Sequence, residues 1–173
     1  AEFSTEEHNW LIPDNLQENP PTLAGRLSPT NLGFLLNARQ VACEFGYLTV
    51  PEFAELTKHT LATSAKLQKC RGHLLNWYDT RTLAPLKPAF VSSVDSGNLV
   101  ASLWTLQQGA LDLLRRPILQ PALAEGFVDY LRILADLHTF PRKQLNELRN
   151  KIREDWLQSI LEFPESSLAD PPD

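Results

Sequence analysis

The chain contains no methionine, and its 173 residues include only seven glycines and two cysteines. Methionine is missing even from position 1, which predicts a processed chain or a segment cut from a larger one. Two cysteines cannot build a disulfide framework, so Cys43 and Cys70 form either one disulfide or two buried thiols. The four histidines have no metal-ligand spacing with each other or with cysteine, so no metal site is expected. The sequence also has no Walker loop and no Rossmann glycine pattern, and no cofactor is expected.

Basic residues are also scarce: 16 Lys and Arg against 21 Asp and Glu leave a net charge of −5. Nucleic-acid binding is therefore disfavoured, because contacts to phosphate need clustered Lys and Arg. The longest nearly apolar runs fall far short of the roughly 20 residues that a membrane span requires. The hydrophobic fraction of 43% is typical of a globular protein, and the length suffices for one domain with a sizeable core.

Apolar residues recur at spacings of three and four in five segments, which is the pattern of helices with one buried face. Ser28-Pro29 and Thr49…Glu52 are helix-start signals, and Gly46 predicts a C-terminal cap. We therefore predict an all-α fold with about five helices in αα-hairpins. The predicted helices cover 28–45, 49–69, 97–114, 121–137 and 139–161.

The helix predicted at 97–114 differs from the others because apolar residues cover most of its circumference. A helix that is apolar nearly all round is usually buried on several sides, so we expect it to be the interior helix of the fold. Asp95 or Ser96 is expected to cap its N-terminus.

Prolines interrupt the first part of the chain, where Pro13, Pro20 and Pro21 block a continuous helix. The apolar sequence WLI at 10–12 is expected to anchor this part on the helices. We therefore divide the chain into an extended N-terminal arm (1–27), a helical domain (28–163) and a frayed acidic tail (164–173).

One long segment, from Arg71 to Asn98, lacks a helical period. We predict a long ordered loop at 71–95, in which LLNWYDTRTLAPL can form a small β-hairpin that turns at Asp79-Thr80-Arg81. Long irregular segments in compact domains are usually functional. The candidate substrate-binding residues of this segment are Arg71, His73, Asn76, Trp77, Tyr78, Asp79, Asp95 and Asn98.

This mixture of side chains fits sugar recognition, because an aromatic face stacks on a pyranose while Asp, Asn and Arg bind its hydroxyls. Asp79 and Asp95 are also candidates for a catalytic carboxylate pair, such as glycosidases use. A structural role for the same residues is the alternative. Trp77 and Tyr78 would then anchor the loop on the helices, Asp79 would pair with Arg81 or cap backbone amides, and Asp95 would cap a helix.

Four motifs stand out by their order and spacing: WLIPDN (10–15), SPTNLG (28–33), RGHLLNWYDTRTLAPL (71–86) and FVSSVDSGNLVASL (90–103). These motifs resemble a segment of the very large cyclic β-1,2-glucan synthases and of related bacterial glucoamylase-like proteins. The resemblance extends over about residues 8–115 and is looser beyond them. NWYDT followed by VSSVDSGNL is its most specific part.

The resemblance implies a bacterial, membrane-associated, multi-domain enzyme in which this segment joins a glycosyltransferase to a glucoamylase-like, glycoside-hydrolase-like region. It implies a cytoplasmic α-helical piece that belongs to, or docks on, an α/α toroid. Glucan or oligosaccharide and the neighbouring domains are the implied partners, and a homo-oligomer is a further expectation. No catalytic residue of the family matches a position here, and the chain is far shorter than the family's enzymes, so independent activity is not expected.

Three functions remain open from the sequence. The first is a helical domain of a carbohydrate-active enzyme that contributes to glucan binding or supports the catalytic barrel. The second is a catalytic fragment of a glycoside hydrolase or transglycosylase that uses Asp79 and Asp95 on β-glucan. The third is a protein-interaction module without affinity for sugar, which an exposed apolar patch would favour.

Overall fold

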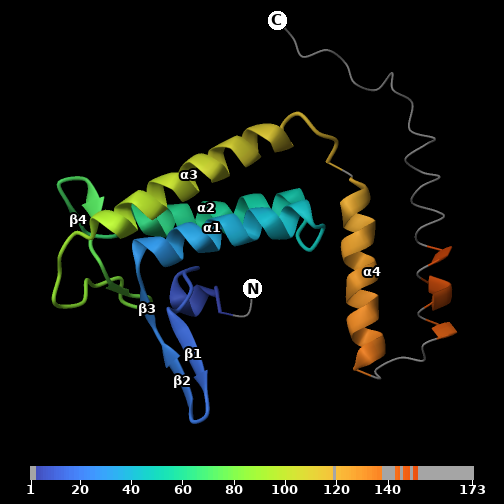
Figure 1. The fold of residues 1–173 in the computed structure, drawn as a ribbon, viewed down its shortest axis with the longest axis horizontal. Coiled ribbons are helices and arrows are strands. Elements are labelled where there is room, and N and C mark those ends of the chain that lie inside the picture. The colour runs from blue at the N-terminus through green and yellow to red at the C-terminus, as the bar shows by residue number, and fades with distance from the viewer. Residues whose placement is uncertain (1–2, 119, 138–142, 145, 149, 152–173) are drawn as a thin grey trace, which may run out of the picture. The chain divides into compact units, whose positions relative to one another are not determined.

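The computed structural model of the protein describes residues 3–118, 120–137, 143–144, 146–148 and 150–151 (Figure 1). Within these residues the chain is mostly helical, with a few short strands in small sheets. Contacts divide it into two compact units. The first unit is made of Ala1–Cys43 and Leu48–Ile118, and the second unit of Glu44–Tyr47 and Leu119–Asp173.

Four α-helices and one short 3-10 helix lie in the described residues: η1 (Glu6–His8), α1 (Pro29–Glu44), α2 (Val50–Lys66), α3 (Ser93–Leu113) and α4 (Pro121–Asp136). The first four predicted helices are thereby confirmed. Most of the fifth, predicted at 139–161, lies outside the described residues. No helix in the described ranges is long and apolar enough to cross a membrane.

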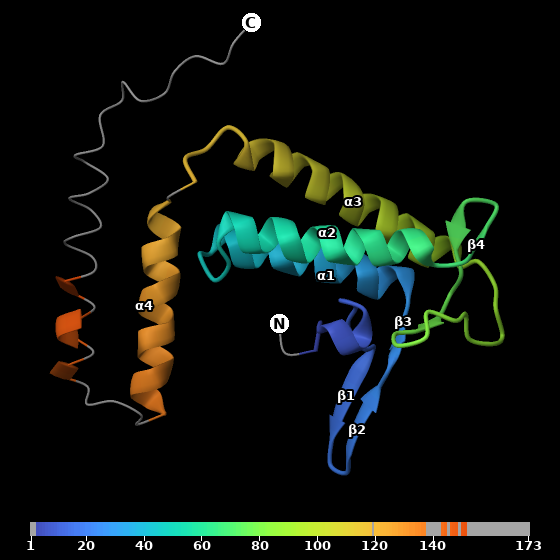
Figure 2. The ribbon, with the colours of Figure 1, turned by 180° about the vertical axis from the view of Figure 1, so that it is seen from behind.

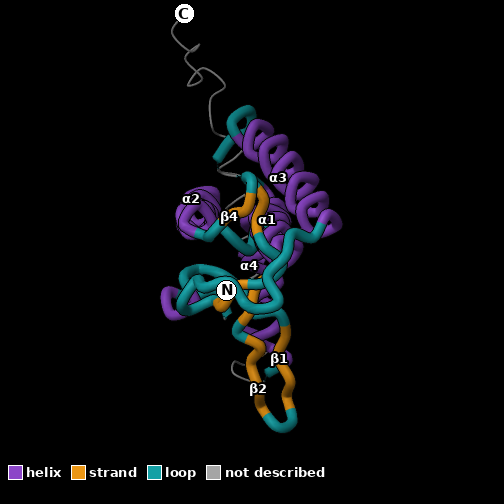
Figure 3. Tube along the Cα trace, turned by 90° about the vertical axis from the view of Figure 1, so that its left-hand side faces the viewer, coloured by secondary structure: helices purple, strands orange, loops and turns teal. Residues whose placement is uncertain are grey.

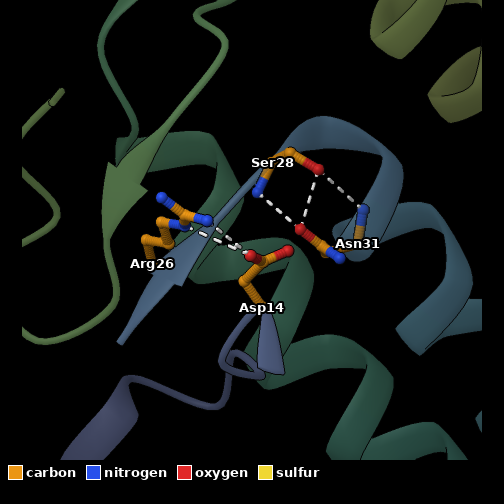
Figure 4. A network of polar contacts seen from close by, with 4 residues as sticks. All are labelled: Asp14, Arg26, Ser28 and Asn31. Atoms are coloured by element: carbon orange, nitrogen blue, oxygen red, sulfur yellow. Dashed lines mark hydrogen bonds and ion pairs between the residues drawn. The ribbon is translucent and has the colours of Figure 1, made fainter. Parts of the chain in front are cut away.

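The starts of α1 and α2 follow the sequence signals, although α2 ends at Lys66 and not at Lys69 as predicted, because Lys69 already belongs to β4. The Ser28 hydroxyl accepts the Asn31 amide at 3.1 Å, while the Asn31 side-chain oxygen accepts the Ser28 amide at 2.9 Å (Figure 4). Thr49 and Glu52 form a complete capping box at the start of α2. Gly46 has a φ of 74°, a left-handed conformation that glycine adopts without steric cost, and it follows the end of α1 as predicted.

The predicted start of α3 was wrong by four residues. Ser92 caps the helix, and its hydroxyl accepts the Asp95 amide at 3.2 Å. Asp95 therefore lies inside the first turn, where its negative charge favours the positive end of the helix dipole. The Ser-x-x-Asp spacing at 92–95 is itself an N-cap pattern. The serine at its first position, and not Asp95, accepts a free backbone amide of the first helical turn.

The prediction that α3 is an interior helix was also wrong. Only Ser102, Leu106 and Gly109 of α3 are buried, while Trp104 is 67% exposed and Val94 is 70% exposed. One narrow stripe of α3 packs against α1: the Ser102 side chain lies against Gly33, and Gly109 lies against the Gln40 side chain. Much of its remaining apolar surface has no cover in the described part of the chain.

The fold is not purely all-α, because short antiparallel strands flank the helices. β1 (Asn15–Glu18) and β2 (Pro21–Ala24) form a hairpin near the N-terminus. The other two pairs join β3 (Arg26–Leu27) with β6 (Tyr78–Asp79), and β4 (Lys69–Cys70) with β5 (His73–Leu74). The β3–β6 pair ties the N-terminal segment to the long loop.

In the first unit α1 and α2 lie side by side, and α3 runs along them (Figures 1 and 2). Figure 3 shows the three helices from the end at which β4 lies. One apolar core lies under the N-terminal segment and the long loop, and a second lies between the helices. The first core contains Leu11, Leu27, Leu32, Leu67, Leu74, Leu75 and Tyr78, and the second contains Leu36, Cys43, Phe53 and Leu106.

The complete burial of Leu11 confirms the predicted anchor at WLI. The two cysteines differ, because Cys43 is buried and Cys70 is exposed, and neither forms a disulfide. The disulfide alternative was therefore wrong, and so was the expectation that both thiols are buried.

The second unit brings α4 against the turn at 44–47. The Tyr47 hydroxyl donates to the Asp129 carboxylate at 3.0 Å, and the Tyr47 ring meets the Tyr130 ring edge-on with centroids 5.9 Å apart. A Cβ added at Gly46 would lie 1.8 Å from the Ala122 carbonyl oxygen, so this close backbone approach requires glycine.

A buried guanidinium joins the N-terminal segment to α1 and α2. Arg39 is only 6% exposed and donates to the Leu56 carbonyl, to the Thr60 hydroxyl at 2.7 Å and to the Ser4 hydroxyl at 2.6 Å. The Trp10 carbonyl accepts from Ser4, Thr60 and Arg39 together. Burial lowers the pKa of Arg39 to about 10, so the group remains charged at neutral pH with neutral oxygens as its acceptors.

Replacing Arg39 should therefore destabilise the fold strongly. We expect Arg39→Met to lower the free energy of unfolding by about 2–3 kcal/mol, because several buried acceptors lose a charged donor. Arg81→Met is the matched control, since the Arg81 side chain makes an exposed ion pair with Glu7 and acts on Asp79 only through its charge, so its loss should cost about 1 kcal/mol at most. Urea unfolding followed by circular dichroism measures both, and equal losses would contradict this role.

Candidate functional site

The predicted site begins at a tight turn between β4 and β5. Arg71 and Gly72 have φ values of 51° and 86°, the two left-handed residues of a type I′ hairpin turn. Arg71 and His73 are both exposed. These two side chains are therefore available to a ligand or partner, and no salt bridge involves either of them in the described residues.

Asn76 closes the long loop from inside. Its side-chain nitrogen donates to the Pro88 carbonyl at 3.1 Å, and its side-chain oxygen accepts from the Phe90 backbone amide at 3.1 Å. The backbone amide of Asn76 donates to the Phe90 carbonyl at 2.8 Å. Asn76 is 4% exposed, so both ends of its amide group bind backbone rather than an external ligand.

Tyr78 is completely buried and belongs to the core. Its hydroxyl accepts the Leu75 amide at 2.6 Å and donates to the Gln68 carbonyl at 2.5 Å. Burial raises the pKa of this phenol. Tyr78 therefore joins the segment after α2 to the loop, which is the anchoring role predicted as the alternative to sugar binding. Because it is completely buried, it offers no surface for a sugar.

Asp79 holds the tip of the loop. Its carboxylate accepts the Arg81 amide at 2.9 Å, the Thr82 amide at 2.7 Å and the Thr82 hydroxyl at 3.0 Å. The backbone pairs across this tip, since the Asp79 amide donates to the Ala84 carbonyl at 2.9 Å. The predicted small hairpin with its turn at Asp79 is thereby confirmed, and the hydrogen bond from the Thr82 amide lowers the pKa of the Asp79 carboxyl.

Trp77 is partly exposed and lies beneath a guanidinium. The Arg26 guanidinium carbon is 4.5 Å from the ring centroid, and Arg26 also pairs with Asp14 at 3.0 Å (Figure 4). A cation over the face of an indole is attracted by its negative quadrupole. One face of the ring is therefore already occupied, although part of the side chain reaches solvent.

Asp95 and Asn98 both contact Thr30 on α1. The Thr30 hydroxyl donates to the Asp95 carboxylate at 2.6 Å and accepts from the Asn98 side chain at 3.1 Å. These bonds join the first turns of α3 to the first turn of α1. Asp95 and Asn98 therefore take part in the contact between α1 and α3.

The eight predicted site residues thus lie at separate places in the first unit rather than around one cleft. Asp79 bonds within the loop tip and Asp95 bonds to α1, so the two carboxylates share no hydrogen-bond partner. An open cavity of about 310 Å³ lies between the helices, and His73 alone among the predicted residues lines it. The described residues hold no group of three or more His, Cys, Asp or Glu that could bind a metal ion.

Several residues that hold this region together were not singled out in the sequence. The His8 ring lies 2.7 Å from the Thr80 hydroxyl, and both side chains are buried. The Asn9 side chain donates to the Thr80 and Arg81 carbonyls at 2.9 and 2.8 Å. The His8 contact spans 72 positions, and no local pattern indicates such distant partners.

Asp79→Ala should lower the free energy of unfolding by about 1–2 kcal/mol at neutral pH, because two amides lose their acceptor. The effect should depend on pH. Since folding lowers the pKa of Asp79, its contribution is complete above the ordinary pKa of about 3.9 and disappears as the pH falls through the lower folded value.

Urea unfolding of the wild-type and Asp79→Asn chains at neutral pH and near pH 3 tests this sign. The charge-dependent difference between the two should shrink in acid. A difference that stays constant, or grows, would show that the carboxylate charge does not stabilise the tip.

No family model matches the chain. A curated relative is the cyclic β-(1,2)-glucan synthase NdvB of Rhizobium meliloti (strain 1021), which is 41% identical over 147 residues. The alignment covers 84% of this chain but only 5% of the relative's length. The motifs at 10–15, 28–33, 71–86 and 90–103 predicted this relationship. The chain is therefore homologous to one segment of the cyclic β-(1,2)-glucan synthases.

Proposed function

We propose that the chain is a non-catalytic helical domain of a carbohydrate-active enzyme of the glucan synthase type, and that it supports the neighbouring catalytic region. The observation that carries this proposal is the use of its polar residues. Four of the predicted site residues form side-chain hydrogen bonds with other parts of the chain: Asn76, Tyr78, Asp79 and Asp95. A preformed sugar site would present such groups to solvent in one cleft.

Catalysis by the two carboxylates is disfavoured by their environments. A glycosidase needs one carboxylic acid with a raised pKa to protonate the leaving group. The pKa of Asp79 is instead lowered by backbone amides. Asp95 accepts the Thr30 hydroxyl at the contact between two helices, which gives it a structural role.

Support of a larger helical assembly agrees with the family relationship. The relative is a glucan synthase of which this segment forms a small part, and a segment of that kind has neighbours within the same polypeptide. We propose that it belongs to, or docks on, an α/α toroid in that enzyme. The exposed apolar residues of α3 provide a surface for such contact.

Direct glucan binding is the second candidate, favoured by the exposed pair Arg71 and His73 and by the partly exposed ring of Trp77. Aromatic and cationic groups of this kind can hold an oligosaccharide weakly. This function requires a part of the Trp77 ring other than the face that lies against Arg26.

Titration of the chain with β-1,2-linked gluco-oligosaccharides, followed by NMR, distinguishes the two functions. The supporting role predicts no saturable shift of the Trp77 and Trp104 indole signals at millimolar sugar. An α-1,4-linked oligosaccharide of the same length controls for non-specific effects. Saturable shifts with the β-1,2 sugar alone, abolished by Trp77→Ala, would establish glucan binding instead.

Long incubation with linear β-1,2-glucan tests catalysis separately. We expect no change in the distribution of chain lengths, as measured by mass spectrometry, because the Asp79 carboxylate accepts backbone amides and the Asp95 carboxylate accepts the Thr30 hydroxyl. Cleaved or cyclised product that disappears in both Asp79→Asn and Asp95→Asn would overturn the non-catalytic assignment.

A further inference from the structure

A groove runs between the helices of the first unit. Its floor is formed by α1, its walls by α2 and α3, and the β4–β5 hairpin closes one end. Its open cavity measures about 310 Å³. The main lining residues are aliphatic: Leu32, Leu36, Leu61, Leu99, Val100 and Leu103.

The lining identifies the kind of occupant. No Phe, Tyr or Trp lines the cavity, so it lacks the stacking platform that a sugar needs. Leu61, Val100 and Leu103 are each more than one third exposed, although they face a concave surface. Aliphatic walls on two helices fit the apolar face of a further helix.

Exposed apolar side chains extend this surface along α3. Val100, Trp104 and Leu111 are spaced by four and seven residues and therefore share one face of the helix. They are 45%, 67% and 43% exposed, and Leu114 at the end of α3 is 83% exposed. Apolar residues clustered in this way usually mark a contact surface rather than a free one.

Charge restricts the partner further. Lys69 and His73 line the closed end of the groove, and Arg71 lies at the turn beside them. Arg115 lies just beyond the C-terminal end of α3, outside the groove lining. No Asp or Glu lines the cavity. An antiparallel second copy would bring these basic ends together, so the surface is complementary to a partner with acidic ends rather than to itself.

We infer that the groove binds an acidic amphipathic helix from the part of the synthase polypeptide that lies outside this segment. The inference rests on the proposed supporting function and names its partner. Since the match covers only 5% of the relative, most of that polypeptide lies elsewhere and can supply such a helix. The Ser96 hydroxyl, which lines the groove and lacks a hydrogen-bond partner in the described residues, would meet a polar group of that helix.

Photocrosslinking in the synthase polypeptide that carries this segment tests the inference. The photoreactive amino acid p-benzoylphenylalanine replaces Val100 in the groove, and in a control polypeptide it replaces Ala62, which is exposed on α2 but does not line the groove. After irradiation, mass spectrometry identifies the attached peptide. We expect Val100 alone to crosslink to one peptide outside residues 1–173, with apolar residues at helical spacing and Asp or Glu near its ends.

Charge provides a second arm of the test. Arg71→Glu, at the exposed β4–β5 turn that closes the groove, should lower the yield of the Val100 crosslink by about threefold or more at low salt. Lys58→Glu on α2, away from the groove, should leave the yield unchanged. Crosslinks from Val100 only to residues 1–173, to a second copy or to lipid would each overturn the inference.

The two proposals fail in different ways. If the chain binds β-1,2-gluco-oligosaccharides while Val100 still crosslinks to an outside helix, the purely supporting function fails and the docking groove stands. If neither sugar binding nor the crosslink is found, the groove assignment fails and the non-catalytic role is unaffected.

Discussion

The first unit depends on a buried positive charge that has no carboxylate among its hydrogen-bond partners in the described residues. Arg39 reaches from α1 to α2 and to the N-terminal segment, and its acceptors are carbonyl and hydroxyl oxygens. Removing a guanidinium from water is costly unless its donors are satisfied, so these acceptors must be held in place. The left-handed turn at Asn9 and Trp10 does this by aiming the Trp10 carbonyl into the network.

The same N-terminal segment also holds the long loop. Thr80 is completely buried, its amide and hydroxyl both donate to the Gly25 carbonyl, and its hydroxyl contacts His8. Residues far apart in the chain thus order one another, and the loop at 71–95 gains its fixed shape from these contacts. This order explains why the polar residues of the loop form hydrogen bonds within the chain, whereas the groove between α2 and α3 is open.

The sequence predicted what is local and missed what is long-range. The helix starts at Ser28 and Thr49 and the turn at Asp79 were predictable because side chain and partner lie within three residues. The site was less predictable, since sugar-binding and loop-closing residues have the same composition. Nothing in the sequence around Asn76 and Tyr78 indicated that their partners are backbone groups. The apolar outer face of α3 was predicted to be buried because an exposed apolar helix face has the same sequence pattern as a buried one.

Amide hydrogen exchange tests the central claim most directly, namely that the N-terminal segment and the long loop form one structural unit. The chain is compared with a version that lacks residues 1–9, which removes the contacts of Ser4, His8 and Asn9. We predict that protection of the Asp79, Thr80 and Leu83 amides falls by about tenfold or more, while the amides in the middle of α3 are unchanged. Unchanged protection at the loop would contradict the account and would leave its polar residues available for another role.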